Sequence, residues 1–140
     1  EADPRYRQLI NASHAPAQPG CDVAEAVCCA MRSTVALVRA AAIVCYTSSG
    51  HTSLRAARER PESAILSLTP NLAVARQLAM VWGVHSVHGQ DVTDVNQMAD
   101  VACEVARRER FAQAGQAIVA IAGMPCGTPG TTNLMRVATV

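Results

Sequence analysis

Four hydroxyl side chains surround the point where an apolar segment gives way to a predicted helix. They are Thr47, Ser48, Ser49 and Thr52, all within Tyr46–Ser53. The first turn of a helix has backbone N–H groups without partners and carries the positive end of the helix dipole, so it attracts phosphate. A serine at such a position often only caps the helix, but capping needs one hydroxyl. We therefore favour a phosphate site over a simple cap.

A second segment, Gly123–Asn133, is rich in residues that fix or free the backbone. It contains three glycines and two prolines and joins two apolar runs, Ala117–Ala122 and Leu134–Val140. This composition sets an unusual backbone path and leaves N–H groups and threonine hydroxyls to face whatever lies beside it. The segment is either a mobile lid or one wall of an anion site, and the hydroxyl-rich stretch favours the anion site.

Two further side chains in these segments have reactive groups. His51 directly follows Gly50 and is placed to donate to a bound phosphate, although a solvated surface histidine fits the sequence equally well. Its protonation would strengthen phosphate binding at pH 6 relative to pH 8. The sequence places no general base to activate Cys126, so we expect no catalytic residue here.

Two common nucleotide-binding motifs are absent from the sequence. Neither Gly-x-Gly-x-x-Gly nor Gly-x-x-x-x-Gly-Lys occurs, which disfavours a dinucleotide fold and an ATPase loop.

Composition limits the function further. The chain has 140 residues, 50% of them hydrophobic and 3% aromatic, with a net charge of +1. The basic residues are all arginine and are scattered, so we expect no nucleic-acid partner. No apolar run reaches the roughly 18 residues that span a bilayer, so we expect no membrane partner either. The six cysteines contain no C-x-x-C pair, which favours reduced, buried thiols in a cytoplasmic protein and no metal site.

The periodicity of apolar residues predicts alternating helices and strands. After Glu1–Gly20, a short helix and linker, Asp22 is expected to cap a helix. The further helices are expected at Gly50–Arg60, Asn71–Trp82 and Thr93–Ala112, and the strands at Ala41–Thr47, Ala64–Leu68, Val84–His88, Ala117–Ala122 and Asn133–Val140. Met31, Met80 and Trp82 are candidates for the core.

This alternation predicts an α/β fold with three layers. The expected sheet is five-stranded and mostly parallel, ordered 3-2-1-4-5, with an antiparallel last strand and helices on both faces. Strands one and four are then neighbours at the topological switch point, where ligands usually bind beyond the strand carboxyl ends. The two segments described above leave those strand ends, so the topology predicts one pocket walled by both.

An ordered set of short motifs resembles the C-terminal domain of pyruvate kinase. The motifs are Ala41–Gly50, Arg58–Pro61, Leu68–Asn71, Arg76-Gln77, Gly83-Val84 and Gly130–Val137. The resemblance implies a domain at residues 22–140, preceded by a connector, residues 1–21, from a catalytic barrel that this chain lacks. The start at Glu1 also suggests an excised fragment.

The resemblance implies a regulatory, effector-binding and oligomerising domain that is not itself catalytic. The parent enzyme would transfer phosphate from phosphoenolpyruvate to ADP, using Mg²⁺ and K⁺ held in the missing barrel, with no cofactor in this chain. Carried over by position, the effector phosphate contacts would be Thr47, Ser48, Ser49, Gly50 and Thr52, with Gly127, Thr128 and Gly130 from the late loop.

Departures from the family pattern bear on the effector. Relatives that respond to fructose 1,6-bisphosphate have a tryptophan and an arginine where this chain has Asp91 and Met98. A sugar monophosphate or AMP is therefore the preferred effector over the bisphosphate, and the partners are the catalytic barrel and further copies in a homotetramer. Two alternatives stay open: a small free-standing enzyme acting on a sugar phosphate through Cys126 or His51, and an assembly module whose pocket has no ligand.

Overall fold

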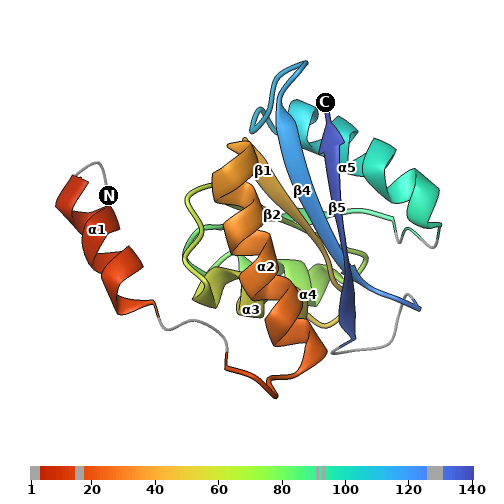
Figure 1. Cartoon of the computed structure of the whole chain (residues 1–140). Helices are drawn as coiled ribbons and strands as arrows, with labels where there is room; N and C mark the ends of the chain where they lie inside the picture. Colours follow the sequence, from red (N-terminus) through yellow and green to blue (C-terminus); the bar gives the residue numbers. More distant parts are fainter. Residues whose placement is uncertain (1–3, 15–17, 91, 93, 126–130) are drawn as a thin grey trace.

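The computed structural model describes residues 4–14, 18–90, 92, 94–125 and 131–140. Five helices and five strands occur in this part of the chain (Figure 1). The helices are α1 (Pro4–Ser13), α2 (Val23–Val38), α3 (His51–Arg58), α4 (Leu72–Leu78) and α5 (Val95–Arg108). The strands are β1 (Ala42–Tyr46), β2 (Ala64–Thr69), β3 (Val84–His88), β4 (Ala117–Gly123) and β5 (Thr132–Thr139).

The strands form one sheet in the order β3-β2-β1-β4-β5. β1 is parallel to both β2 and β4, β2 is parallel to β3, and β4 pairs antiparallel with β5. The predicted order and the predicted direction of the last strand are both confirmed. β1 and β4, which lead into the two candidate segments, are neighbours.

Alternate residues of the central strands pack on opposite faces of the sheet, because successive side chains of a strand point in opposite directions. Ile43 and Cys45 of β1 join a core with Met31 of α2 and Ala56 of α3. Ala42 and Val44 face the other way, into a core that includes residues of α5. In Figure 1, α2 and α3 cover one face with α4 beside α3, α5 covers the other, and α1 lies apart from both layers.

The starts of α2 and α4 follow the expected capping chemistry. An Asp22 carboxylate oxygen accepts a hydrogen bond from Glu25 N at 2.7 Å. The Asn71 side-chain oxygen accepts from Ala73 N and Val74 N at 2.9 and 3.3 Å. Each cap supplies a partner for N–H groups that the first turn leaves unsatisfied. The Asp22 cap was predicted from the sequence and is confirmed.

Three helix ends are formed by left-handed arginines instead of glycine. Arg39, Arg60 and Arg110 have φ angles of 51°, 49° and 63°. After α5, Phe111 N donates to Ala106 O at 2.9 Å, a bond that closes the helix end around Arg110. Sequence reasoning extended this helix to Ala112 because no glycine marks the end.

The predicted core positions Met80 and Trp82 are wrong, whereas Met31 is fully buried. Met80 is 89% exposed and Trp82 37% exposed. The helix predicted to reach Trp82 ends at Leu78. The chain then forms a tighter turn, in which Val81 N donates a hydrogen bond to Leu78 O. The following residues therefore leave the buried stripe, and the Trp82 ring packs under the Arg60 guanidinium, whose carbon lies 4.3 Å from the ring centroid.

Among the described residues, no helix is both long enough and apolar enough to cross a bilayer.

Candidate functional site

The candidate site lies at one edge of the sheet. β1 and β4 run parallel, with Cys45 paired to Ile121 near their carboxyl ends. The segment after β1 therefore leaves the same edge as the segment after β4 (Figure 1). This is the switch point of the sheet, because α3, which connects β1 to β2, and α5, which connects β3 to β4, lie on opposite faces.

The turn from β1 into α3 is built around Gly50. Gly50 is the N-cap of α3 with a φ of 88°, and a Cβ there would meet Val74 Cγ1 at 3.4 Å. A side chain would strain this backbone, so the turn needs glycine. Thr47 Oγ1 accepts a hydrogen bond from Gly50 N at 2.8 Å, which holds the turn closed.

Ser48 and Ser49 do not cap α3. In the described part of the chain, no side-chain hydrogen bond caps this helix, and both serines are half-buried. The simple-cap interpretation therefore does not describe these serines. The Ser49 hydroxyl instead lies 2.9 Å from Nδ1 of the exposed His51. The turn thus places hydroxyls and an imidazole at the positive end of a helix.

Thr52 connects the start of α3 to the start of β5. Its Oγ1 lies 2.8 Å from Thr132 Oγ1. The contact is buried, because Thr52 is 6% exposed and Thr132 is 2% exposed. One hydrogen bond therefore joins the hydroxyl-rich turn to the strand that follows the late loop. The two segments that sequence topology placed at the same edge are in direct contact.

The base of the late loop is closed by two further contacts. Asn133 accepts from Met124 N at 2.9 Å and donates through Nδ2 to Met124 O at 2.7 Å. A Cβ on Gly123 would lie 2.8 Å from Thr131 O, so only glycine admits this approach of the backbone. These contacts bring both ends of the loop together beside α3.

The predicted contacts Gly127, Thr128 and Gly130 lie outside the described residues, as does Cys126. Of the predicted site, the structure therefore places Thr47, Ser48, Ser49, Gly50, His51 and Thr52 in one turn.

Sequence reasoning missed the roles of Thr132 and Asn133, which hold the late loop at its base. Asn133 had a readable signal, since an asparagine readily bonds to nearby backbone. Thr132 had none, because its partner Thr52 is 80 residues away along the chain.

The start of α5 is attached to the same edge of the sheet. The Tyr46 hydroxyl at the end of β1 donates to Met98 O at 2.7 Å. Burial raises the pKa of Tyr46, so this phenol stays protonated and keeps donating. Met98 is 2% exposed and apolar, so at that position the chain offers no cation to a second phosphate.

Three of the described thiols, those of Cys28, Cys45 and Cys103, are poor nucleophiles. Burial raises the pKa of Cys28 to about 12 and also raises the pKa of Cys45 and Cys103. A thiol rather than a thiolate therefore predominates at neutral pH, and the thiolate is the reactive form. The five described cysteines form no disulfide with one another.

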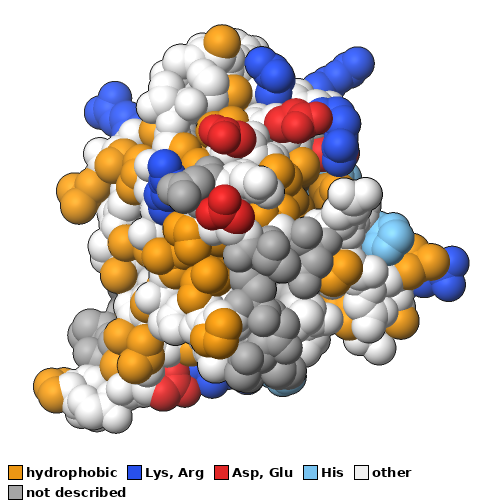
Figure 2. Space-filling view, turned by 90° about the vertical axis from the view of Figure 1, so that its right-hand side faces the viewer, with side chains coloured by type: hydrophobic (Ala, Val, Ile, Leu, Met, Phe, Trp, Pro, Cys, Tyr) orange, Lys and Arg blue, Asp and Glu red, His pale blue; other side chains and the backbone are white. Residues whose placement is uncertain are grey.

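The face on the right-hand side of Figure 1, where α5 lies, is mixed in character. Figure 2 shows this face, with apolar side chains grouped near the centre, acidic side chains mostly among or above them, and most of the basic side chains toward the margins. Val137 of the edge strand β5 is 46% exposed.

The sheet order and the helices on both faces define a doubly wound α/β domain. The chain belongs to the family described as "Pyruvate kinase, alpha/beta domain", whose model matches residues 25–138. It is 39% identical over 140 residues to a pyruvate kinase of Methylorubrum extorquens, covering all of this chain. A pyruvate kinase of Geobacillus stearothermophilus is 43% identical over 97 residues, covering 69% of this chain.

Solved structures agree with this assignment. The Cryptosporidium parvum pyruvate kinase in complex with ADP superposes with a TM-score of 0.81 at 26% identity, over 96% of this chain and 27% of that chain. The present chain spans 29% of the length of the Methylorubrum extorquens relative and 16% of the Geobacillus stearothermophilus relative. The resemblance read from short motifs is confirmed by all three kinds of comparison.

Proposed function

We propose that this chain is the effector-binding and assembly domain of a pyruvate kinase, with residues 1–21 leading from the catalytic barrel. The Thr52–Thr132 hydrogen bond of 2.8 Å carries the proposal, because it joins the start of β5, the strand after the late loop, to the first turn of α3. A phosphorylated metabolite would bind between the two segments. Its binding would favour one conformation of a homotetramer and so alter transfer of phosphate from phosphoenolpyruvate to ADP in the barrel, where Mg²⁺ and K⁺ act.

Each described side chain has a distinct part in this proposal. The first-turn N–H groups of α3 and the half-buried hydroxyls of Ser48 and Ser49 would bind the phosphate oxygens. His51 would donate from the exposed side of the turn. Thr47 and Thr52 hold the turn and the loop base through their bonds to Gly50 and Thr132.

A monophosphate fits this turn better than a bisphosphate. Arginine is the residue that pairs most effectively with a phosphate, through a bidentate contact. The position that would supply such a cation near the start of α5 is Met98, which is buried. We therefore propose a sugar monophosphate or AMP as the effector, in a cytoplasmic enzyme.

Calorimetry on the full chain tests the proposal. Glucose 6-phosphate, ribose 5-phosphate, AMP and fructose 1,6-bisphosphate are titrated alongside glucose and adenosine, which lack phosphate. We expect a monophosphate to bind and both unphosphorylated compounds to fail. If no phosphorylated compound binds at millimolar concentration, the effector role is wrong, although membership of the family stands.

A paired variant locates the site. Ser48→Ala with Ser49→Ala removes two hydroxyls that would bond to a charged ligand, each worth about 1.5–3 kcal/mol. We expect the affinity for the bound monophosphate to fall by more than tenfold. Ser33→Ala is the matched control, because Ser33 is exposed on α2 and bonds only to Cys29 O at 3.3 Å among the contacts described. If the double serine variant loses no more affinity for the monophosphate than Ser33→Ala does, the ligand binds elsewhere.

A further inference from the structure

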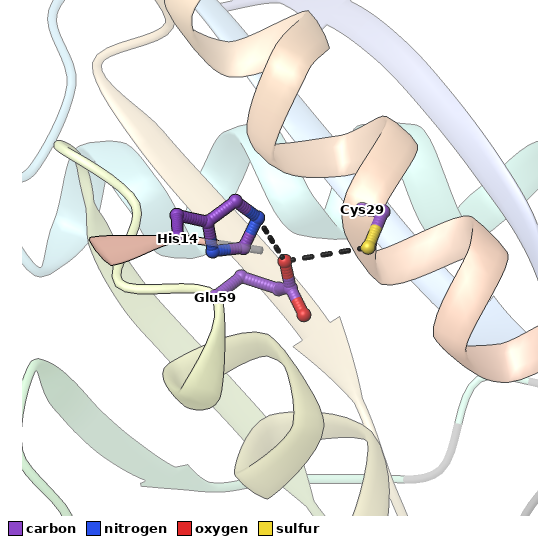
Figure 3. Close-up of side chains that lie close together, drawn as sticks. All are labelled: His14, Cys29 and Glu59. Carbon is purple, nitrogen blue, oxygen red and sulfur yellow. Dashed lines mark hydrogen bonds and ion pairs between the residues drawn. The ribbon is translucent and has the colours of Figure 1, made fainter. Parts of the chain in front are cut away.

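Three metal-binding side chains meet away from the proposed effector turn. His14 follows α1, Cys29 lies on α2, and Glu59 caps the end of α3. Figure 3 shows the His14 ring and the Cys29 sulfur on either side of one Glu59 oxygen. His14 Nε2 lies 3.2 Å and Cys29 Sγ 3.4 Å from Glu59 Oε2. All three ligand atoms lie within 4.8 Å of one another.

These separations suit a tetrahedral metal ion. Zinc binds histidine nitrogen and carboxylate oxygen at about 2.0–2.2 Å and thiolate sulfur at about 2.3 Å, so adjacent ligand atoms lie roughly 3.3–3.8 Å apart. Two of the three pairs already have about this spacing. The third pair, His14 with Cys29, lies within 4.8 Å, which a side-chain rotation can close.

These three ligand types favour some metal ions over others. A thiolate with an imidazole favours zinc and related soft cations over Mg²⁺ or Ca²⁺, which prefer oxygen ligands. The thiolate and the carboxylate together carry two negative charges, which a divalent ion neutralises. The site is also sheltered, since the His14 and Glu59 side chains are 22% and 12% exposed.

We propose that His14, Cys29 and Glu59 form a zinc-class metal site that fastens the segment following α1 to α2 and α3. Binding replaces the Cys29 S–H bond with a sulfur–metal bond, and the thiol proton passes to solvent. The proton on His14 Nε2, which now points to Glu59 Oε2, moves to Nδ1 by exchange with solvent, so that the Nε2 lone pair and Oε2 can both bind the ion.

One of the three proposed ligands also faces a pocket. Glu59, but neither His14 nor Cys29, lines a pocket of about 210 Å³ together with Cys28 and Arg58. A water molecule occupies about 30 Å³ of liquid, so the pocket admits water on the Glu59 side of the cluster. Three protein ligands with a water is the coordination seen in open zinc sites.

The site adds to the contacts that hold α1. In the structure, Arg7 Nη1 of α1 donates to Arg60 O at 3.2 Å, and Asn11 accepts from Arg32 Nη2 at 2.7 Å. Both are exposed contacts, and exposed polar contacts contribute little to stability. A metal bound to His14 would fix the same segment far more firmly, because it joins three elements through coordinate bonds.

Cobalt(II) titration of the reduced, metal-free full chain tests the site. We expect one equivalent of Co²⁺ to produce thiolate-to-cobalt charge-transfer absorption with tetrahedral visible bands, and Zn²⁺ to remove both. Cys29→Ser abolishes the charge-transfer band. Loss of residues that only orient a ligand lowers metal affinity about 10–100-fold, so His14→Gln and Glu59→Gln lower it by at least ~10-fold.

The chain offers matched controls. His85 Nε2 lies 3.2 Å from Glu109 Oε2, the same distance as in the cluster, so His85→Gln removes a similar pair. Cys103→Ser removes a half-buried thiol on α5. Both retain the cobalt spectrum and the affinity. Circular dichroism confirms that each variant is folded.

Two outcomes overturn the site. Charge-transfer absorption that persists in folded Cys29→Ser assigns the thiolate to another cysteine. A cobalt affinity unchanged in folded His14→Gln leaves the cluster as a hydrogen-bonded contact alone. Neither result bears on the effector turn, which lies at the other end of α3.

Discussion

Thr52 and Thr132 share a buried hydrogen bond of 2.8 Å between residues 80 positions apart. The bond links the first turn of α3 to the strand that ends the late loop. Both residues are almost fully buried, and among the described residues each hydroxyl has the other as its partner. This pair therefore sets how closely the two walls of the proposed effector site approach.

Removing either hydroxyl should destabilise the fold. Thr52→Val or Thr132→Val leaves one buried hydroxyl without its partner, which costs about 1–3 kcal/mol in the free energy of unfolding. The double variant should lose less than the sum of the two, because neither hydroxyl then remains. Urea unfolding measures all three. Thr139→Val, on the exposed part of the same strand, should stay within about 0.5 kcal/mol of the wild type.

Gly123 should tolerate no side chain. An added Cβ would lie 2.8 Å from Thr131 O, and backbone there cannot give way cheaply. Gly123→Ala should lower the free energy of unfolding by about 1–3 kcal/mol through overpacking. Gly89→Ala is the control, because a Cβ there meets nothing within 4 Å. Equal stability of the two variants would show that the loop base rearranges freely.

Phosphate binding should weaken when the His51 imidazole is removed. Ser49 Oγ lies 2.9 Å from His51 Nδ1, so the ring is held at the turn where it can donate to a bound phosphate. Calorimetry with wild type and His51→Gln measures the loss of affinity for the bound monophosphate. Equal affinities of the two proteins would remove His51 from the site.

Asp22 should make stability depend on pH. The hydrogen bond from Arg55, followed by that from Glu25 N, lowers the pKa of this carboxyl below 3.8. A lowered folded-state pKa contributes stability above the unfolded value and loses it as the pH falls through the folded value. Asn retains the capping oxygen, so Asp22→Asn should be less stable than wild type at pH 7, and the difference in stability should shrink as the pH falls below 3.8. Denaturation across this range measures the difference, with Asp100→Asn on α5 as the control.

The left-handed helix ends offer a stabilising change. Arg110 is exposed with a φ of 63°, a conformation that costs an L-residue roughly 1–2 kcal/mol. Arg110→Gly should raise the free energy of unfolding by about 0.5–1 kcal/mol after allowing for the greater freedom of unfolded glycine. Arg60→Gly should gain less, because it also removes the contact with Trp82 at 4.3 Å. Thermal unfolding of the two variants compares them directly.

Local pattern predicted most of the architecture. The strand Val84–His88 was predicted with its observed bounds, and the sheet order followed from right-handed crossovers between parallel strands. The turn at Thr47–Thr52 was also readable, because hydroxyls and glycine before a helix have a local physical meaning. The strand and the turn depend on neighbours a few residues away, so the sequence by itself determined them. The sheet order pairs strands far apart in the chain, such as β1 with β4, so the sequence could only indicate an order that fits.

Long-range contacts decided the rest. The sequence could not pair Thr52 with Thr132, because hydroxyls that are distant along the chain carry no periodic signal. Met80 and Trp82 matched a buried helical stripe, yet the helix ended at Leu78 and turned them outward. His14, Cys29 and Glu59 come from separate segments, and only the tertiary structure brings their ligand atoms within 4.8 Å. Such convergence follows from the way apolar surfaces pack in three dimensions, which local spacing does not encode.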